Sequence, residues 1–214
     1  MGKKKKKARE LAKAEHATVG HVARAADTAP VAFLGKASDV ADQPPLVVLS
    51  LATIAVGVVL RRRDVTRTGA RMLLAHALAT AGKTVLKRAI DRSRPRRSLK
   101  DGQHHAGSGS GSDDTDLNSF PSGHTAGAVS VAEAIAQTAP GYAGPARGGA
   151  AIVAAIQLPR GAHYPSDVAV GAGIGWVADR LAGMAVDAAE RAIDRRLKGN
   201  DEDRAIEEAE AHPS

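Results

Sequence analysis

Apolar and polar stretches alternate along this chain in a pattern that predicts helices. Five stretches rich in Ala, Gly, Val and Leu follow one another, at residues 46–60, 70–86, 122–139, 148–158 and 168–186. Most are longer than an ordinary strand, and alternation with a period of two is almost absent. The expected fold class is therefore all-α, with about five apolar helices packed into one bundle.

The first apolar stretch comes closest to a membrane span, because the 18 residues between Asp42 and Arg61 carry no charge. The other stretches are shorter or contain charged residues, namely Arg71, Lys83, Glu133, Asp179 and Arg180. Two interpretations follow from the residues alone. One is a soluble bundle with Ala-rich cores. The other is a membrane helical bundle whose small residues, as in Gly171-x-x-x-Gly175, let helices approach closely.

The polar segments divide the chain into three expected parts. Residues 1–43 would form a basic tail and an amphipathic helix that precede the bundle. Residues 44–187 would form the bundle itself, with a flexible loop at 96–118, because this segment contains an alternating run of Gly and Ser. Residues 188–214 would form a polar helical C-terminal tail with mixed charges.

The positive charge of the chain is concentrated at its start. The 214 residues carry a net charge of +7, but residues 1–13 alone carry +6. With only 2% aromatic residues, the chain also lacks the side chains on which single-stranded nucleic acids stack. We therefore expect no nucleic-acid partner, and a tail that is either solvated or attracted to anionic lipid head groups. The absence of cysteine excludes a thiol nucleophile and a zinc–thiolate site.

Candidate chemistry stands at the ends of the apolar stretches. Lys87 and Arg94 follow the second stretch and are separated by seven residues, or two helical turns. If the helix continues to Arg94, where Pro95 ends it, both cations share one face. An Arg fork and a mobile Lys ammonium at such a helix end would make a phosphate clamp. A basic turn beside a membrane is the alternative.

The third stretch opens with Ser122, Gly123 and His124. Ser favours the first positions of a helix, and Gly lets a ligand approach the backbone. His124 would then lie in the first helical turn, where unpaired N–H groups favour an anion. From that position an imidazole can give a proton to a leaving oxygen. An ordinary capped helix start would have the same residues.

The fifth stretch follows His163 and Asp167, which are four residues apart. A carboxylate one helical turn from an imidazole can accept the Nδ1–H and leave Nε2 as a nucleophile. A surface pair would show the same spacing. Arg160 lies three residues before His163 and supplies a further cation.

Taken together, the Lys-x6-Arg-Pro, Pro-Ser-Gly-His and His-Tyr-Pro-Ser-Asp segments resemble the type 2 phosphatidic acid phosphatase family. That family shares its site with bacterial non-specific acid phosphatases and vanadium haloperoxidases, and the resemblance covers roughly residues 44–186. It implies that His163 forms a phosphohistidine, that Asp167 orients it, and that His124 protonates the leaving alcohol. It further implies a phosphate cradle of Lys87, Arg94, Ser122 and Gly123, without a metal or another cofactor.

One position departs from the family pattern. The family's third motif usually begins with Ser-Arg, the Arg standing six residues before the nucleophilic His, whereas this chain has Ile156 and Gln157 there. A phosphate-binding cation is therefore missing from its usual place. Arg160 is the residue that we expect to replace it.

The sequence thus predicts a membrane phosphatase that hydrolyses a lipid phosphate or diphosphate monoester. It would be an integral protein of a bacterial-type inner (plasma) membrane with an extracytoplasmic site, its partners being the lipid phosphate and the membrane. Two alternatives remain open: a weak or inactive member that serves as a basic membrane-associated adaptor, and a vanadate-dependent haloperoxidase. Neither the specific lipid nor the oligomeric state can be predicted from the residues.

Overall fold

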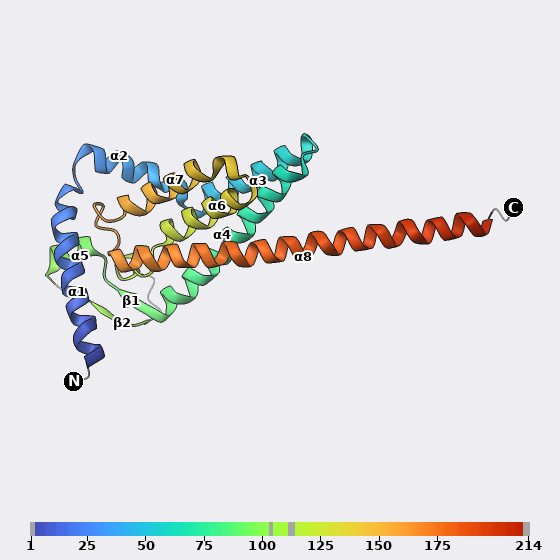
Figure 1. The fold of residues 1–214 in the computed structure, drawn as a ribbon. Coiled ribbons are helices and arrows are strands. Elements are labelled where there is room, and N and C mark those ends of the chain that lie inside the picture. The colour runs from blue at the N-terminus through green and yellow to red at the C-terminus, as the bar shows by residue number, and fades with distance from the viewer. Residues whose placement is uncertain (1–2, 103–104, 111–113, 212–214) are drawn as a thin grey trace.

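The computed structural model describes residues 3–102, 105–110 and 114–211 of the chain (Figure 1). Its N-terminal part contains helix α1 (Lys3–Val22), a short 3-10 turn η1 (Ala23–Ala25), helix α2 (Ala29–Ala37) and a second turn η2 (Ser38–Ala41). The amphipathic helix expected within residues 1–43 therefore corresponds to α1, which η1 follows. Figure 1 shows α1 crossing one end of the bundle, beside the start of α8.

The five apolar stretches form the bundle that the sequence predicts. They correspond to α3 (Gln43–Val59), α4 (Arg63–Ala89), α6 (Gly123–Thr138), α7 (Ala143–Ile156) and α8 (Pro165–Ala211). Helices α4, α6 and α8 pack against one another at the centre, while α3 packs on α4 and α7 packs on α6. The core is built largely of alanine, including the fully buried Ala75, Ala134 and Ala182. The short turn η4 (Pro140–Tyr142) connects α6 to α7.

The small residues of α8 allow two backbones to come close together. An added Cβ on Gly171 would lie 2.5 Å from the Ser122 carbonyl oxygen, and one on Gly175 would lie 2.6 Å from that of Ala126. Both distances are too short for a contact between a Cβ atom and a carbonyl oxygen, so a larger residue would not fit at either position. The expected close approach at Gly171-x-x-x-Gly175 is therefore confirmed, between α6 and α8.

Three of the charged residues within the apolar stretches, Arg71, Glu133 and Asp179, are paired across helices. Arg71 of α4 forms a two-pronged contact with Asp179 of α8, at 2.7 and 2.9 Å. Glu133 of α6 does the same with Arg147 of α7, also at 2.7 and 2.9 Å. Pairing of this kind offsets the cost of taking each charge out of water. These residues interrupt the hydropathy pattern but hold the helices in register.

The segment after α4 differs from the prediction. Helix α4 ends at Ala89 rather than at Arg94, and strand β1 (Ile90–Arg92) follows it and pairs antiparallel with β2 (Ala106–Ser108). The prediction that Lys87 and Arg94 share one helical face is therefore wrong. Strand β2 gives residues 90–92 alternative hydrogen bonds, and Pro95 holds Arg94 in an extended conformation (φ −67°, ψ 147°).

The expected flexible loop at 96–118 contains short elements. These are helix α5 (Pro95–Asp101), which begins one residue before the loop, strand β2, and the 3-10 turn η3 (Thr115–Leu117). The residues of this loop numbered 103–104 and 111–113 lie outside the described part of the chain. The two-stranded sheet also means that the fold is predominantly, rather than purely, helical.

The polar C-terminal segment continues α8 without a break, so that this helix has 47 residues and extends well beyond the bundle (Figure 1). Among the described residues, no helix taken alone has both the length and the apolar composition of a bilayer span. One bent pair meets both criteria together, Ala29–Ala41 with Gln43–Val59, joined at an angle of 53°.

Candidate active site

The three candidate clusters meet at one end of the bundle. This end is formed by the last turn of α4, the first turn of α6 and the first turn of α8. The backbone N–H of Ser122 donates to the carbonyl of Asp167 at 3.0 Å and so connects the starts of α6 and α8. The bundle therefore gathers residues from three separate parts of the sequence around a single site.

His163 is buried directly before α8, with only 2% of its surface exposed. Its Nδ1 lies 2.7 Å from the carbonyl oxygen of Ser119 and 3.8 Å from Oδ2 of Asp167. A carbonyl oxygen can only accept, so Nδ1 carries the proton and Nε2 keeps its lone pair. Burial lowers the pKa of His163, although Asp167 and the Ser119 carbonyl oppose that shift. A neutral imidazole with an unprotonated Nε2 is the form that can act as a nucleophile.

Asp167 is fully buried and accepts three hydrogen bonds. They come from Nη1 of Arg92 at 2.5 Å, from the Ser119 hydroxyl at 2.6 Å and from the Tyr164 N–H at 2.8 Å. Burial alone would raise the pKa of this carboxyl, but its contact with His163, the charge of Arg92 and the Ser119 hydroxyl bring it below its usual value. The nearest partner of the His163 Nδ1–H is thus the Ser119 carbonyl, and Asp167 supplies a negative charge beside the ring.

Lys87 and Arg94 lie at this site although they come from different elements. The Lys87 ammonium donates to the Asn118 carbonyl at 3.1 Å, and Nε of Arg94 donates to the Thr115 carbonyl at 2.9 Å. Burial, together with the charges of Arg94 and Lys83, lowers the pKa of Lys87 to about 8. Two partly buried cations that raise each other's energy form a site for an anion.

Lys83 is a third cation here, and the sequence interpretation treated it only as an interruption of an apolar stretch. An added Cβ on Gly123 would lie 3.2 Å from its ammonium nitrogen, so that this group lies against the first residue of α6. No hydrogen bond to its ammonium is found among the described residues. Lys83 precedes Lys87 by four residues on a helix, and that spacing was the available signal that both face the site.

Ser122 and Gly123 begin α6. The Ser122 hydroxyl caps the helix by accepting from the Thr125 N–H at 3.4 Å, and it also lies 2.9 Å from the Thr125 hydroxyl. Gly123 is the first helical residue, and the first N–H groups of a helix have no acceptor within it. The Gly123 amide is thus placed to bind an anion, whereas Ser122 holds the helix start.

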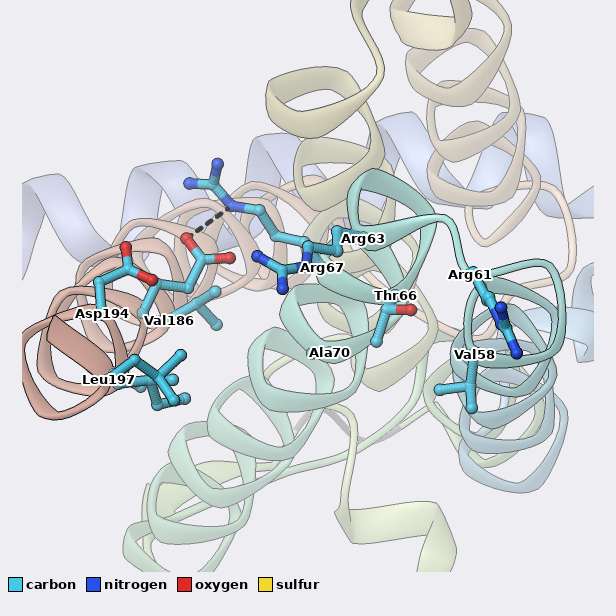
Figure 2. Close-up of a pocket in the computed structure, with 13 residues that line it drawn as sticks. Val58, Arg61, Arg63, Thr66, Arg67, Ala70, Val186, Asp194 and Leu197 are labelled. Carbon is cyan, nitrogen blue, oxygen red and sulfur yellow. Dashed lines mark ion pairs between the residues drawn. The ribbon is translucent and has the colours of Figure 1, made fainter. Parts of the chain in front are cut away.

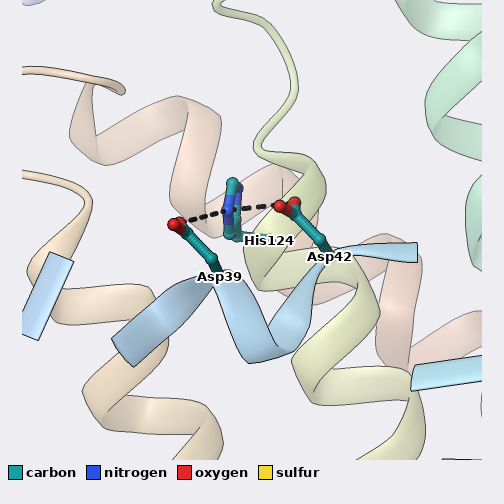
Figure 3. A group of neighbouring side chains, drawn as sticks. All are labelled: Asp39, Asp42 and His124. Carbon is teal, nitrogen blue, oxygen red and sulfur yellow. Dashed lines mark ion pairs between the residues drawn. The ribbon is translucent and has the colours of Figure 1, made fainter. Parts of the chain in front are cut away.

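His124 faces two carboxylates of the N-terminal segment (Figure 3). Its Nε2 lies 3.1 Å from Oδ1 of Asp42 and 3.7 Å from Oδ1 of Asp39. Burial lowers the pKa of His124, and both carboxylates oppose this shift. The three ligand atoms lie within 4.8 Å of one another, a spacing that a cation could bridge. A proton on His124 would instead place one positive charge beside the same two carboxylates.

Arg160, the expected replacement for the missing family Arg, is held by the turn η2. Its Nη1 donates to the Ser38 hydroxyl at 2.8 Å and lies 3.3 Å from Oδ1 of Asp39. Gln157 is fully buried, and its amide donates to the Val153 carbonyl at 2.9 Å. Arg160 therefore lies at the side of the site that His124 and Asp39 form, and its contact with a phosphate remains a prediction.

Two buried residues of this region were missed by the sequence interpretation. Arg92 stands between Lys87 and Arg94 in the sequence, and the motif pattern assigned no role to it. A further Arg within a motif segment was a weak signal that it also lies at the site. Glu15 lies on α1, far from every motif, and no local pattern marked it. The structure places Arg92 against Asp167 and Glu15 against Arg92.

One sizeable cavity of the described residues lies far from this chemistry. It measures about 720 Å³ and lies between the α3–α4 turn and α8, at the opposite end of α4 (Figure 2). Its walls combine apolar residues with the arginines of that turn, including Val58, Arg61, Arg63, Arg67, Val186 and Leu197. A cavity of this volume at the far end shows that volume alone does not mark the candidate site.

Comparisons with known proteins find two solved structures that are similar to this chain. The crystal structure of LpxE from Aquifex aeolicus is 24% identical over 73% of this chain and 96% of that chain, with a TM-score of 0.44. The PAP2-type phosphatidylglycerolphosphate phosphatase from Bacillus subtilis is 20% identical over 82% of this chain and 95% of that chain, with a TM-score of 0.37. Among curated proteins, no match is found.

The family comparison covers the helices that carry the site. The model of the PAP2 superfamily matches residues 68–188, which is more than half of the chain. The matched region includes both expected catalytic histidines and Asp167, the motif cations, all of α6, most of α4 and the first half of α8. The chain therefore belongs to the PAP2 superfamily.

Proposed function

We propose that this protein is a membrane phosphatase that hydrolyses a lipid phosphate or diphosphate monoester through a phosphohistidine on His163. The observation that carries the proposal is the 2.7 Å contact between Nδ1 of His163 and the Ser119 carbonyl. It fixes the tautomer in which Nε2 is the nucleophile, at a site where Lys87, Arg94 and Lys83 bring positive charge.

The phosphoryl group would be held by cations and backbone. Arg94 would use its terminal nitrogens, Lys87 and Lys83 their ammonium groups, and Gly123 its N–H at the start of α6. Positive groups fixed before the reaction stabilise the charge that develops on the phosphoryl oxygens. This set supplies the neutralisation that a metal ion provides in other phosphatases, so the proposed reaction needs no metal or other cofactor.

In the first step, Nε2 of His163 attacks phosphorus and forms the N–P bond. The bond between phosphorus and the leaving oxygen breaks, and that oxygen takes a proton from His124 to leave as an alcohol, or as a phosphate when the substrate is a diphosphate. The imidazole ring becomes positively charged as it bonds to phosphorus, and the buried carboxylate of Asp167 stabilises this charge.

In the second step, water attacks phosphorus and the N–P bond breaks. His124, which is now neutral, takes a proton from the water, so that inorganic phosphate leaves and both histidines return to their starting forms. Asp42 and Asp39 face His124 and favour its protonated form. They would therefore ready it for the first step of the next cycle.

A lipid substrate is supported by the apolar surface beside the site. A groove of about 660 Å³ runs between α4 and α8, and its lining is almost wholly apolar, with Leu78, Val85, Leu86, Val170, Ile174 and Leu181. Val170 follows Asp167 by only three residues, so that a hydrocarbon chain in this groove would start next to the phosphate cradle. Large apolar side chains are also exposed elsewhere on α3 and α8, including Val59 at 78% and Met184 at 67%.

The arginine-rich turn supports an extracytoplasmic site. It connects α3 and α4 directly, at the end of α4 opposite Lys87, and α4 is about 40 Å long. Basic residues in short connections between spans remain in the cytoplasm. The lysines at residues 3–7 precede the first apolar stretch by about 40 residues, outside the ~15–20 residues next to a span on which this rule depends. We therefore place the site outside the cytoplasm, across an inner (plasma) membrane.

Phosphate release from detergent-solubilised protein tests the function. We expect the wild-type chain to release phosphate from one or more of phosphatidic acid, phosphatidylglycerol phosphate and polyprenyl phosphates in the presence of EDTA. His163→Ala should abolish release, whereas a chain lacking residues 2–7 should retain it. A wild-type chain that releases none from the whole panel would support the adaptor interpretation. Halide oxidation that depends on added vanadate would support the haloperoxidase interpretation.

A further inference from the structure

Helix α1 reaches the catalytic cluster through Glu15. This residue is only 7% exposed, and both of its carboxylate oxygens are used. Oε2 accepts from Nη2 of Arg92 at 2.7 Å, and Oε1 accepts from the backbone N–H of Ser166 at 2.7 Å. Glu15 lies outside residues 68–188, so that it is a feature of this chain beyond the region that the family model matches.

The contact of Glu15 continues directly to the residues around the nucleophile. Arg92 uses its other terminal nitrogen, Nη1, to donate to Asp167 at 2.5 Å and to the Ser166 hydroxyl at 2.7 Å. Its guanidinium also lies over the Tyr164 ring, 4.1 Å from the centroid. The guanidinium of Arg92 therefore connects Glu15 to Asp167, the carboxylate beside His163, through one hydrogen bond on each side.

The packing of α1 fixes this arrangement from a second side. Val19, one turn after Glu15, is almost completely buried. Gly20 faces α5, and a Cβ added to it would lie 3.4 Å from Cδ2 of Leu99. Helix α1 is thus held by apolar contact with α5 as well as by the ion pair with Arg92.

The charges explain why a second carboxylate matters. Arg92 carries one positive charge that two buried carboxylates share, so the group of three has a net charge of −1. Two charged groups act directly on His163: Arg94 lowers the pKa of its ring, and Asp167 raises it. If Glu15 were neutral, the charge of Arg92 would be balanced by Asp167 alone. The ring of His163 would then lose part of the negative potential that stabilises its positive form.

We propose that α1 completes the active site and that Glu15 is a positioning residue, which acts on His163 through Arg92 and Asp167. This inference rests on the proposed phosphohistidine mechanism. Glu15 sets the orientation of Arg92 and the start of α8 through Ser166, and it divides the Arg92 charge between two carboxylates. A buried glutamate that only fastened a terminal helix would stabilise the fold but leave the chemistry unchanged.

The test compares Glu15→Gln with Glu10→Gln, because Glu10 lies on the same helix and is exposed. Both variants remove one negative charge and keep the shape of the side chain. We expect Glu15→Gln to lower kcat on the order of 10-fold to 100-fold, with a smaller change in KM, because small misplacements of a reacting group have effects of this size. The acidic limb of kcat/KM should shift to lower pH, since the pKa of His163 falls when a negative charge is removed. Glu10→Gln should match the wild type in every respect.

Glu15→Asp provides the second variant, because it keeps the charge and changes the length. We expect the pH profile of Glu15→Asp to remain close to that of the wild type even where kcat falls. If Glu15→Gln keeps the wild-type kcat and pH profile while its melting temperature falls, Glu15 is merely structural and the inference is wrong. The same holds if both Glu15 variants shift the profile equally. A wild-type chain without phosphatase activity would overturn the proposed function, and this inference with it.

Discussion

The ammonium of Lys87 changes its charge state within an accessible pH range. Its pKa of about 8 means that the group is mostly charged at pH 7 and mostly neutral at pH 9. Because the charged form binds the phosphoryl group, we expect its loss to give kcat/KM an alkaline limb with an apparent pKa near 8, in addition to the decline at lower pH that loss of the His124 proton would cause. Lys87→Arg should remove this limb, since a guanidinium stays protonated throughout the range.

Steady-state rates between pH 6 and 10 check this prediction, with Lys100→Arg as the control. Lys100 is an exposed residue of α5 away from the cradle. Its substitution should leave the alkaline limb in place. A wild-type kcat/KM that stays level up to pH 10 would mean that Lys87 is not a phosphate ligand or that it is not desolvated as described.

At the scale of single residues, the motifs predicted which side chains gather but not all of their contacts. His163 and Asp167 are adjacent, as their spacing suggested, yet the nearest partner of the His163 Nδ1–H is a backbone carbonyl. Backbone atoms leave no trace in a sequence, so the role of Ser119 could not be predicted. Glu15 is separated from Asp167 by most of the chain, and only the path of the folded chain brings the two together.

At the scale of helices, the ion pair between Arg71 and Asp179 joins α4 to α8 inside the bundle. Replacing one member of a buried pair leaves the other charge without compensation, which typically costs about 3–5 kcal/mol. We therefore expect Asp179→Asn to lower the free energy of unfolding by this amount, in chemical denaturation followed by circular dichroism. The double variant Arg71→Met with Asp179→Leu should recover most of the loss, because no unpaired charge remains.

An exposed pair provides the matched control. Arg62 and Asp64 form the same type of contact at 2.8 Å, but both side chains are about 60% exposed. Asp64→Asn should change the free energy of unfolding by less than about 1 kcal/mol, as is usual for surface pairs. Equal effects at Asp64 and Asp179 would contradict the view that burial of the α4–α8 pair determines its importance.

The apolar stretches predicted the helices well because a bundle core needs continuous apolar faces, whatever the topology. The end of α4 was predicted wrongly for a physical reason. Residues 90–92 form a strand only because β2 lies alongside them, and β2 comes from a Gly- and Ser-containing segment with no strand pattern of its own. Hydrogen bonds between distant segments of weak intrinsic preference cannot be derived from local pattern.

At the scale of the whole molecule, the site and the arginine-rich turn mark opposite ends of the bundle. Helix α4 runs from one to the other, and apolar side chains are exposed between them on α3 and α8. Under the proposed function, a bilayer would lie between these two ends. The lysines at the start of α1 do not contradict it, since α1 lies against the catalytic end and its lysines are far along the chain from the first apolar stretch.

The absence of cysteine makes the proposed orientation directly testable, because a single introduced thiol is then the only one in the protein. Ser108→Cys places an exposed thiol on β2 at the catalytic end, and Leu60→Cys places one beside the arginine-rich turn without changing its charge. In intact bacterial cells that express these variants, a membrane-impermeant maleimide should label Ser108→Cys. It should label Leu60→Cys only after the cells are permeabilised, and the parent chain in neither case. The opposite pattern would put the catalytic end in the cytoplasm. Labelling of both variants only after permeabilisation would mean that the two ends lie on the same, inner side, and that the bundle does not separate them across a bilayer.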